Sequence, residues 1–121
     1  MMPTILVVDD EINLRSLYAS ELQDQGYRVI TAASGYEALR WLDAEPDLVI
    51  LDIKLEHDNG LEFLRRMKEV RPSLAVILNS GFSTYKDDFT SWLADAYLVK
   101  SGDTSELLSK VRELLEPRPV G

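Results

Sequence analysis

Short apolar runs alternate along this chain with segments of helical spacing, and this alternation limits the folds open to it. Each run has four to six residues and is rich in Val, Ile and Leu, which is typical of strands buried on both faces of a sheet. The expected strands are TILVV (4–8), YRVITA (27–32), DLVIL (47–51), LAVIL (74–78) and AYLV (96–99). Strands that alternate with helices predict a parallel sheet with right-handed crossovers and helices on both faces.

The segments between the runs predict five helices. The first has Leu14, Leu17, Tyr18 and Leu22 on one face, with Gly26 as its C-cap. Start signals precede three others, namely Ser34 with Glu37, Asn59 with Glu62, and Asp103 with Glu106. The helix expected over residues 84–93 has the weakest pattern. The chain is therefore expected to be an α/β protein with one doubly wound, five-stranded parallel sheet flanked by five helices.

Composition excludes several classes of function. The chain has 121 residues, which suggests one domain, and its formal net charge is −8 without a Lys/Arg cluster. Direct nucleic-acid binding is not expected, because phosphate backbones require a basic surface. Cysteine is absent, which leaves no disulfide or thiol chemistry. No apolar run reaches the roughly 20 residues that cross a membrane. The first residues, MMPTILVV, lack the basic region and the length of a signal peptide, so we expect a cytoplasmic protein without a membrane contact.

Polar residues follow the ends of four expected strands. Asp9 and Asp10 come directly after the first strand, and Asp52 follows the third. Ser80 lies just after the fourth strand, and Lys100 ends the fifth. Because ligands bind beyond the carboxyl ends of parallel strands, we expect these five side chains to converge on one crevice.

Three neighbouring carboxylates favour a bound divalent cation. Like charges raise one another's pKa, and Mg²⁺ removes that conflict because it prefers oxygen ligands and accepts one or two carboxylates plus a phosphoryl oxygen. Lys100 can hold a phosphoryl oxygen as a point charge, and the Ser80 hydroxyl can donate to another. Asp52 is then placed to attack phosphorus and form an acyl phosphate. The plainer alternative is that Asp9 and Asp10 only cap the first helix.

Six pieces of the sequence form a known pattern, namely ILVVDDE (5–11), ASGYEAL (33–39), DLVILDI (47–53), Gly60, VILNSG (76–81) and AYLVK (96–100). Through these pieces, residues 3–116 resemble the receiver domain of two-component response regulators. Their order and spacing are specific, whereas no single piece is. The resemblance implies a flavodoxin-like fold with strand order 2-1-3-4-5 and a receiver domain over residues 1–116. Residues 117–121 are then a linker stub, or the point where a longer chain was cut.

The resemblance also implies a role for each polar residue. Asp52 is expected to be the phosphoacceptor and Lys100 the lysine that binds the phosphoryl group. The expected Mg²⁺ ligands are the carboxylates of Asp10 and Asp52 and the backbone carbonyl of Lys54, with Asp9 acting through water. Two further residues form the expected switch, in which the aromatic rotamer follows the hydroxyl, namely Ser80 and Tyr97.

The sequence departs from the family pattern at two places near this site. Ser101 follows Lys100 where proline is usual, and because a non-proline cis peptide bond costs about 2.5–4 kcal/mol, we expect this bond to be trans. Lys54 places a cation two residues after the acceptor. That cation is expected to slow or steer the attack of hydrolytic water.

The resulting functional prediction is a phosphorylation-dependent signalling switch rather than an enzyme with dedicated turnover. Its expected partners are a sensor histidine kinase or phosphotransfer protein and, downstream, a protein target or fused output domain; dimerisation on activation is left open. One alternative is a Mg²⁺-dependent phosphohydrolase with an aspartyl nucleophile. That class requires an aspartate where this chain has Lys54. The other alternative is a receiver-like interaction module that needs no phosphate.

Overall fold

The structure, a computed structural model, describes residues 2–55, 58–81, 92–101 and 103–116. Its elements along the chain are β1 (Thr4–Val8), α1 (Ile12–Asp24), β2 (Arg28–Ala32), α2 (Gly35–Trp41), the short 3₁₀ helix η1 (Leu42–Ala44), β3 (Leu48–Leu51), α3 (Gly60–Val70), β4 (Ala75–Ser80), β5 (Ala96–Val99) and α4 (Ser105–Leu115). All five expected strands and four of the five expected helices are therefore confirmed. The helix expected over 84–93 lies outside the described residues, apart from its last two positions, and so does the expected linker stub at 117–121.

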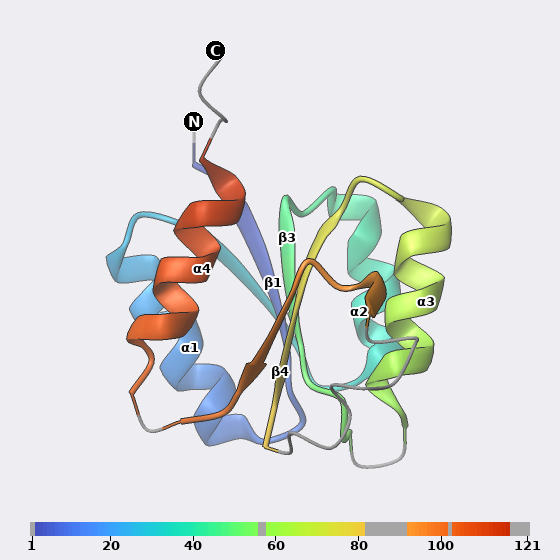
Figure 1. Cartoon of the computed structure of the whole chain (residues 1–121), viewed down its shortest axis with the longest axis horizontal. Coiled ribbons are helices and arrows are strands. Elements are labelled where there is room, and N and C mark those ends of the chain that lie inside the picture. The colour runs from blue at the N-terminus through green and yellow to red at the C-terminus, as the bar shows by residue number, and fades with distance from the viewer. Residues whose placement is uncertain (1, 56–57, 82–91, 102, 117–121) are drawn as a thin grey trace.

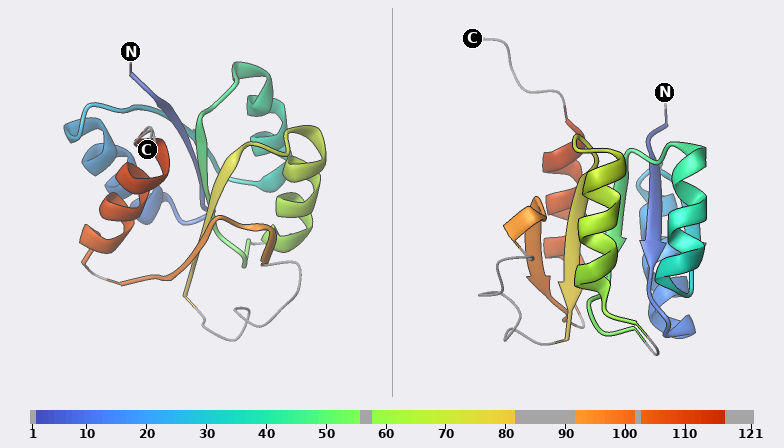
Figure 2. Two further views of the ribbon diagram at one scale, coloured as in Figure 1. Left: turned by 45° about the horizontal axis from the view of Figure 1, so that its top comes forward. Right: turned by 90° about the vertical axis from the view of Figure 1, so that its right-hand side faces the viewer.

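The five strands form one parallel sheet in the order β2-β1-β3-β4-β5, which confirms the expected topology. Helices α1 and α4 cover one face of the sheet, and α2 and α3 cover the other (Figures 1 and 2). In Figure 1 the carboxyl ends of the strands lie at the bottom, whereas β1 begins and α4 ends at the top. Among the described residues, no helix combines the length and apolar character that crossing a bilayer requires.

The edge strands are less buried than the sequence pattern predicts. Strands β1, β3 and β4 are almost wholly buried, but only Ala32 in β2 and Leu98 in β5 are. Each edge strand has a single neighbouring strand, so its outer side and part of its faces remain in contact with solvent. The expectation of burial on both faces was therefore wrong for these two strands.

Two separate hydrophobic cores lie on the two faces of the sheet. On what we call the α2/α3 face, residues such as Leu6, Val8 and Phe63 pack together. On the α1/α4 face, residues such as Ile5 and Val7 pack against the two helices there. The split follows from the alternation of side chains along a strand.

Helix starts confirm most of the local expectations. The Ser34 Oγ accepts a hydrogen bond from the Glu37 backbone N–H at 3.1 Å, as in a capping box. The Glu37 carboxylate accepts one from the Ala33 N–H at 3.0 Å, one residue before the cap. Asn59 caps α3 by accepting from the Leu61 N–H at 2.9 Å. One expectation was wrong: the Leu17 side chain, placed with the buried stripe of α1, is 42% exposed.

Candidate functional site

The sheet continues for one residue beyond three of its strands, and these residues carry the charged groups. The Asp9 N–H donates to the Ala32 carbonyl at 3.1 Å, and the Asp52 N–H donates to the Val8 carbonyl at 3.0 Å. The Lys100 N–H similarly donates to the Ser80 carbonyl at 2.6 Å. The backbone of each charged residue is therefore hydrogen-bonded to a neighbouring strand, which favours a well-defined site geometry.

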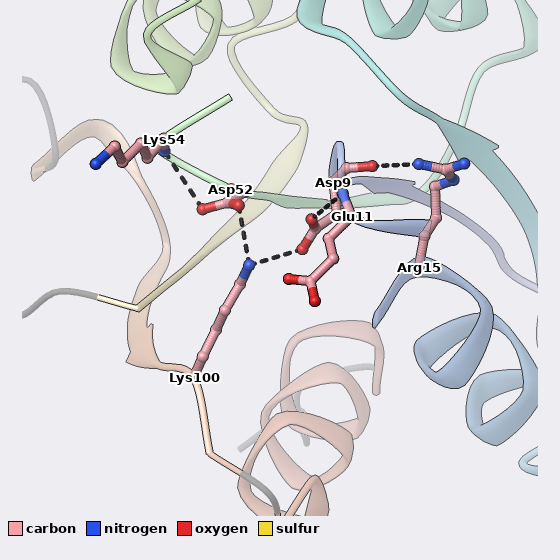
Figure 3. A network of polar contacts seen from close by, with 6 residues as sticks. All are labelled: Asp9, Glu11, Arg15, Asp52, Lys54 and Lys100. Carbon is pink, nitrogen blue, oxygen red and sulfur yellow. Dashed lines mark hydrogen bonds and ion pairs between the residues drawn. The ribbon is translucent and has the colours of Figure 1, made fainter. Parts of the chain in front are cut away.

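Lys100 reaches between two buried carboxylates. Its Nζ lies 2.8 Å from Asp9 Oδ2 and 2.9 Å from Asp52 Oδ2, and Figure 3 shows the ammonium pointing at both. The side chains of Asp9, Asp52 and Lys100 are only 3%, 7% and 17% exposed. Little water remains to screen these charge-assisted hydrogen bonds, which makes them stronger than their surface counterparts.

Burial and mutual attraction act in opposite directions on the two charges. Burial raises the pKa of the Asp52 carboxyl above its usual value, although the hydrogen bond and charge of Lys100 work against that rise. Burial by itself would lower the pKa of the Lys100 ammonium, but the hydrogen bonds to Asp9 and Asp52 outweigh it and raise that pKa. Lys100 therefore stays cationic, while the ionised form of Asp52 would gain from further positive charge.

Asp9, Asp10 and Asp52 form an acidic cluster with the chemistry of a magnesium site. Each offers one carboxylate oxygen, and these oxygens all lie within 4.8 Å of one another. The three negative charges are opposed by one ammonium, so the donor set fits a hard divalent cation. Both oxygens of Asp9 already have partners, since Oδ1 accepts from the Glu11 N–H at 2.9 Å and Oδ2 accepts from Lys100.

The loop after β3 is held tightly beneath Asp52. The Lys54 N–H donates to Asp52 Oδ1 at 3.3 Å, and Lys54 pairs with Asn59 in an isolated antiparallel bridge. The Gly60 N–H donates to the Ile53 carbonyl at 2.6 Å. A Cβ on Gly60 would collide with the Asp52 carbonyl oxygen, so this close approach requires glycine. The Lys54 ammonium points away from the Asp52 carboxylate (Figure 3).

Ser80 and Tyr97 lie on the other face of the sheet from the charged side chains. Ser80 ends β4 with its side chain fully buried, and it follows Val76 and Leu78 in the alternation that faces α2 and α3. Tyr97 pairs with Leu78 in the sheet register and packs, half-buried, against the same core. The two are therefore near neighbours on one face, and their coupled movement stays a prediction.

Three polar residues close to the site have no role predicted from the sequence. Arg15 on α1 donates from its guanidinium to the Asp9 carbonyl at 2.6 Å, which fixes the turn between β1 and α1. Tyr18 and Asn79 are both buried beside the charged cluster. The sequence carried one signal for them, since Asn79 interrupts an otherwise apolar strand. The expected trans bond after Lys100 is confirmed, because the described residues contain no cis peptide.

Three comparisons with known proteins point to one family. The profile of the response regulator receiver domain family matches residues 5–112. The response regulator ArlR of Staphylococcus aureus is 36% identical over 120 residues, which is 98% of this chain and 55% of ArlR, so the chain spans about half the length of the curated relatives it matches. The structure is also similar to that of the response regulator TrrA from Thermotoga maritima in complex with Mg(2+)-BeF, with a TM-score of 0.91, 44% identity, and coverage of 94% of this chain and 100% of TrrA. A second similar structure is that of the histidine kinase ThkA in complex with TrrA, with a TM-score of 0.88, 44% identity and coverage of 95% and 100%.

Proposed function

The chain belongs to the response regulator receiver domain family, and from this premise we propose that it is a signalling switch that accepts a phosphoryl group on Asp52. The observation that carries the proposal is the placement of Lys100 between Asp52 and Asp9, beside a cluster of three carboxylates. Such a site combines a carboxylate nucleophile with fixed positive charge, which is most of what phosphoryl transfer requires of a protein.

Asp10, Asp52 and the backbone carbonyl of Lys54 would hold Mg²⁺ directly. Asp9 would act through water, because both of its carboxylate oxygens have partners already. Bound there, Mg²⁺ would offset the negative charge of the phosphoryl oxygens and of the carboxylates around them. The TrrA structure that resembles this chain contains Mg(2+)-BeF, which supports a magnesium site in the same kind of fold.

Asp52 supplies the nucleophile in the transfer step. One of its carboxylate oxygens forms a bond to phosphorus as the bond between phosphorus and the donor's nitrogen or oxygen breaks, and the leaving group keeps that electron pair. Lys100 then transfers its hydrogen bonding from the carboxylates to the incoming phosphoryl oxygens. Lys100 keeps its positive charge throughout, because the carboxylates raise the pKa of its ammonium by more than burial lowers it.

Phosphorylation would then change the surface of the protein. The added group carries about −1.5 to −2 charges near neutral pH, and the Ser80 hydroxyl would move to donate to it. Tyr97, on the same face of the sheet, would turn inward into the space that Ser80 leaves. A domain with two nearly balanced states needs only this local bias to change its population.

The partners follow from the same proposal. A sensor histidine kinase or a phosphotransfer protein would donate the phosphoryl group, as the complex of ThkA with TrrA suggests. A downstream protein or a fused output domain would read the change, and whether two activated copies pair is left open. We expect this activity in the cytoplasm, with no direct contact to nucleic acid or membrane, and with no dedicated substrate turnover.

Phosphorylation by acetyl phosphate tests the proposal directly. Intact mass spectrometry in the presence of Mg²⁺ should show the wild-type protein gaining one phosphoryl group and Asp52→Asn gaining none. Asp47→Asn is a matched control, because Asp47 is an exposed aspartate immediately before the same strand. It should be labelled like the wild type.

Two results would count against the proposal. Equal labelling of the wild type and Asp52→Asn would remove Asp52 as acceptor. Sustained release of phosphate from phosphomonoesters, which disappears in Asp52→Asn, would instead favour a phosphohydrolase with an aspartyl nucleophile.

A further inference from the structure

Asp9 is held through both of its backbone groups and both of its carboxylate oxygens. Its N–H donates to the Ala32 carbonyl in the sheet, and its carboxylate oxygens accept from the Glu11 N–H and from Lys100. Its own carbonyl accepts from the Arg15 guanidinium at 2.6 Å (Figure 3). Of these contacts, only the last comes from a side chain of α1, and it acts on the peptide group that leads to the next residue of the acidic cluster.

Asp10 lies between two peptide groups that are both held in place. A peptide group is planar, so the contact of Arg15 with the Asp9 carbonyl also orients the N–H and the Cα of Asp10. On the other side, the Glu11 N–H donates to Asp9 Oδ1 at 2.9 Å, which orients the next peptide group. Asp10 is the one member of the acidic cluster that is not buried, so packing is less able to hold its carboxylate. The direction of that carboxylate therefore depends on the two backbone contacts.

Helix stability does not account for an arginine at position 15. Arg15 is the fourth residue of α1, and a cation near the N-terminus of a helix opposes the helix dipole. Glu11 lies four residues earlier, which is the spacing of a helical ion pair, yet the two side chains point apart without a contact (Figure 3). The guanidinium instead reaches back to the Asp9 carbonyl, in the direction in which helix side chains lean. Its position and its partner therefore serve the turn before the helix.

We propose that Arg15 is a positioning residue for the carboxylate of Asp10. By holding the peptide group between Asp9 and Asp10, it keeps an Asp10 oxygen close to those of Asp9 and Asp52, all within 4.8 Å of one another. The inference rests on the proposed function, because that carboxylate is the one that would hold Mg²⁺. It deepens that function by adding a residue that contacts neither the metal ion nor the phosphoryl group.

Positioning and charge predict opposite effects when Arg15 is replaced by a neutral residue. The guanidinium is a positive charge near three carboxylates, so its charge alone weakens the binding of a further cation. Loss of that charge would therefore strengthen Mg²⁺ binding. Loss of the hydrogen bond to the Asp9 carbonyl would instead free the Asp10 carboxylate and weaken Mg²⁺ binding. The sign of the change in Mg²⁺ affinity decides between the two effects.

The test is a titration of metal-free protein with Mg²⁺ alone, followed by NMR of the backbone amides. Arg15→Met should raise the Kd for Mg²⁺ about tenfold, the low end of the range for lost partners behind a metal ligand. Arg15→Lys keeps the charge and a donor on a chain of similar length, so it should bind Mg²⁺ more tightly than Arg15→Met. An unchanged or lower Kd in Arg15→Met would overturn the inference, and so would a Kd in Arg15→Lys that is no lower than in Arg15→Met.

Two control variants separate positioning from charge and from stability. Arg28→Met removes an exposed arginine at the start of β2, at the end of the sheet away from the acidic cluster, and should leave the Kd for Mg²⁺ unchanged. Leu22→Ala opens a cavity beneath α1, so it should lower stability and also leave that Kd unchanged. A tenfold rise of the Kd in either control would overturn the inference, because the effect would then follow net charge or stability.

A crystal structure of metal-free Arg15→Met tests the inference without Mg²⁺. The Asp10 carboxylate should be displaced, so that its oxygens no longer lie within 4.8 Å of the oxygens of both Asp9 and Asp52. If the carboxylate keeps its place, the positioning role is wrong, whatever the wild type binds. If instead the wild-type protein binds no Mg²⁺ while Asp10 moves in the variant, the proposed function fails and the positioning role stands.

Discussion

The two faces of the sheet are built from the same strands but end differently. On the α2/α3 face, Val8 and Leu51 keep two strand ends apolar, and Ser80 is the polar residue that ends β4 there. On the α1/α4 face, the next residues in the alternation are Asp9, Asp52 and, two strands away, Lys100. Because neighbouring residues of a strand point to opposite faces, one side of the sheet can hold a large apolar core while the other carries charge. The comparison indicates that the charged groups of the site lie on one face, whereas the Ser80 hydroxyl and Tyr97 lie on the other.

This separation predicts that damage to one face should leave the property of the other intact. The α2/α3 core contains Phe63, which is 2% exposed and meets Tyr36 in an edge-to-face contact with ring centroids 5.1 Å apart. The α1/α4 core is interrupted by the buried polar pair of Tyr18 and Asn79. We therefore expect variants of the α2/α3 core to change the free energy of unfolding but not ligand binding, and variants of the charged residues on the other face to change ligand binding as well.

The largest effect is expected for Phe63→Ala. Removing a buried aromatic ring costs about 3–5 kcal/mol, because the ring packs against Gly35 and the helices around it. Urea denaturation should show that loss, while beryllofluoride affinity at a temperature where the variant is folded should match the wild type. A large loss of affinity in the folded variant would break the separation between the faces.

A smaller effect on stability is expected for Lys100→Met. Without the ammonium, Asp9 and Asp52 remain buried beside each other, and breaking a buried ion pair costs about 3 kcal/mol or more. The partial exposure of Lys100 favours the low end of that range. The loss should be measured by urea denaturation with EDTA present, and saturating Mg²⁺ should recover part of it by supplying positive charge to the same carboxylates.

Identical stabilities of Lys100→Met in EDTA and in Mg²⁺ would show that the acidic cluster binds no magnesium. Arg112→Met serves as a control, since Arg112 is an exposed cation on α4 and does not belong to the acidic cluster. Its stability should change little in either buffer, as is usual for surface positions.

The smallest effect is expected for the pH dependence of Asp52→Asn. Burial raises the pKa of Asp52 in the folded protein above its ordinary value of 3.8, so the folded state holds this proton to higher pH than the unfolded state. The contribution of Asp52 to stability therefore falls as pH rises from that ordinary value through the folded-state pKa, and the loss is complete above it.

Asparagine does not titrate, so the variant should lack this decline. In EDTA, urea denaturation from about pH 4 to about pH 7 should show the stability of Asp52→Asn increasing relative to the wild type and then levelling. A relative stability that decreases with pH would mean that Lys100 lowers the pKa of Asp52 by more than burial raises it.

The fold and the proximity of Asp9, Asp10, Asp52 and Lys100 could be predicted from the sequence because both depend on local patterns, whereas the roles of these residues stay predictions. Parallel strands could be placed from their apolar runs, and the residues that follow them had to meet at one edge of the sheet. Burial at the edges could not be read in this way, since it depends on which strand ends up outermost. Leu17 was wrongly predicted to be buried. The face of α1 that packs on the sheet is narrower than the positions of its apolar residues suggest.

The contributions of Tyr18 and Arg15 were hidden for a different reason. Tyr18 looks like an ordinary core residue on a helix, and Asn79, which lines the same small cavity, is distant in sequence. Arg15 donates a hydrogen bond to the Asp9 backbone carbonyl. Every residue has a backbone carbonyl, so the sequence does not indicate which one a side chain will contact. These contacts become apparent only in the folded structure.

A crystal structure of the protein with Mg²⁺ and beryllofluoride tests the central claim most directly. We predict beryllium bonded to a carboxylate oxygen of Asp52, with Mg²⁺ beside Asp10 and with Lys100 Nζ moved from Asp9 to a fluoride. Beryllofluoride bound elsewhere, or Lys100 still held by both Asp9 and Asp52, would contradict the account.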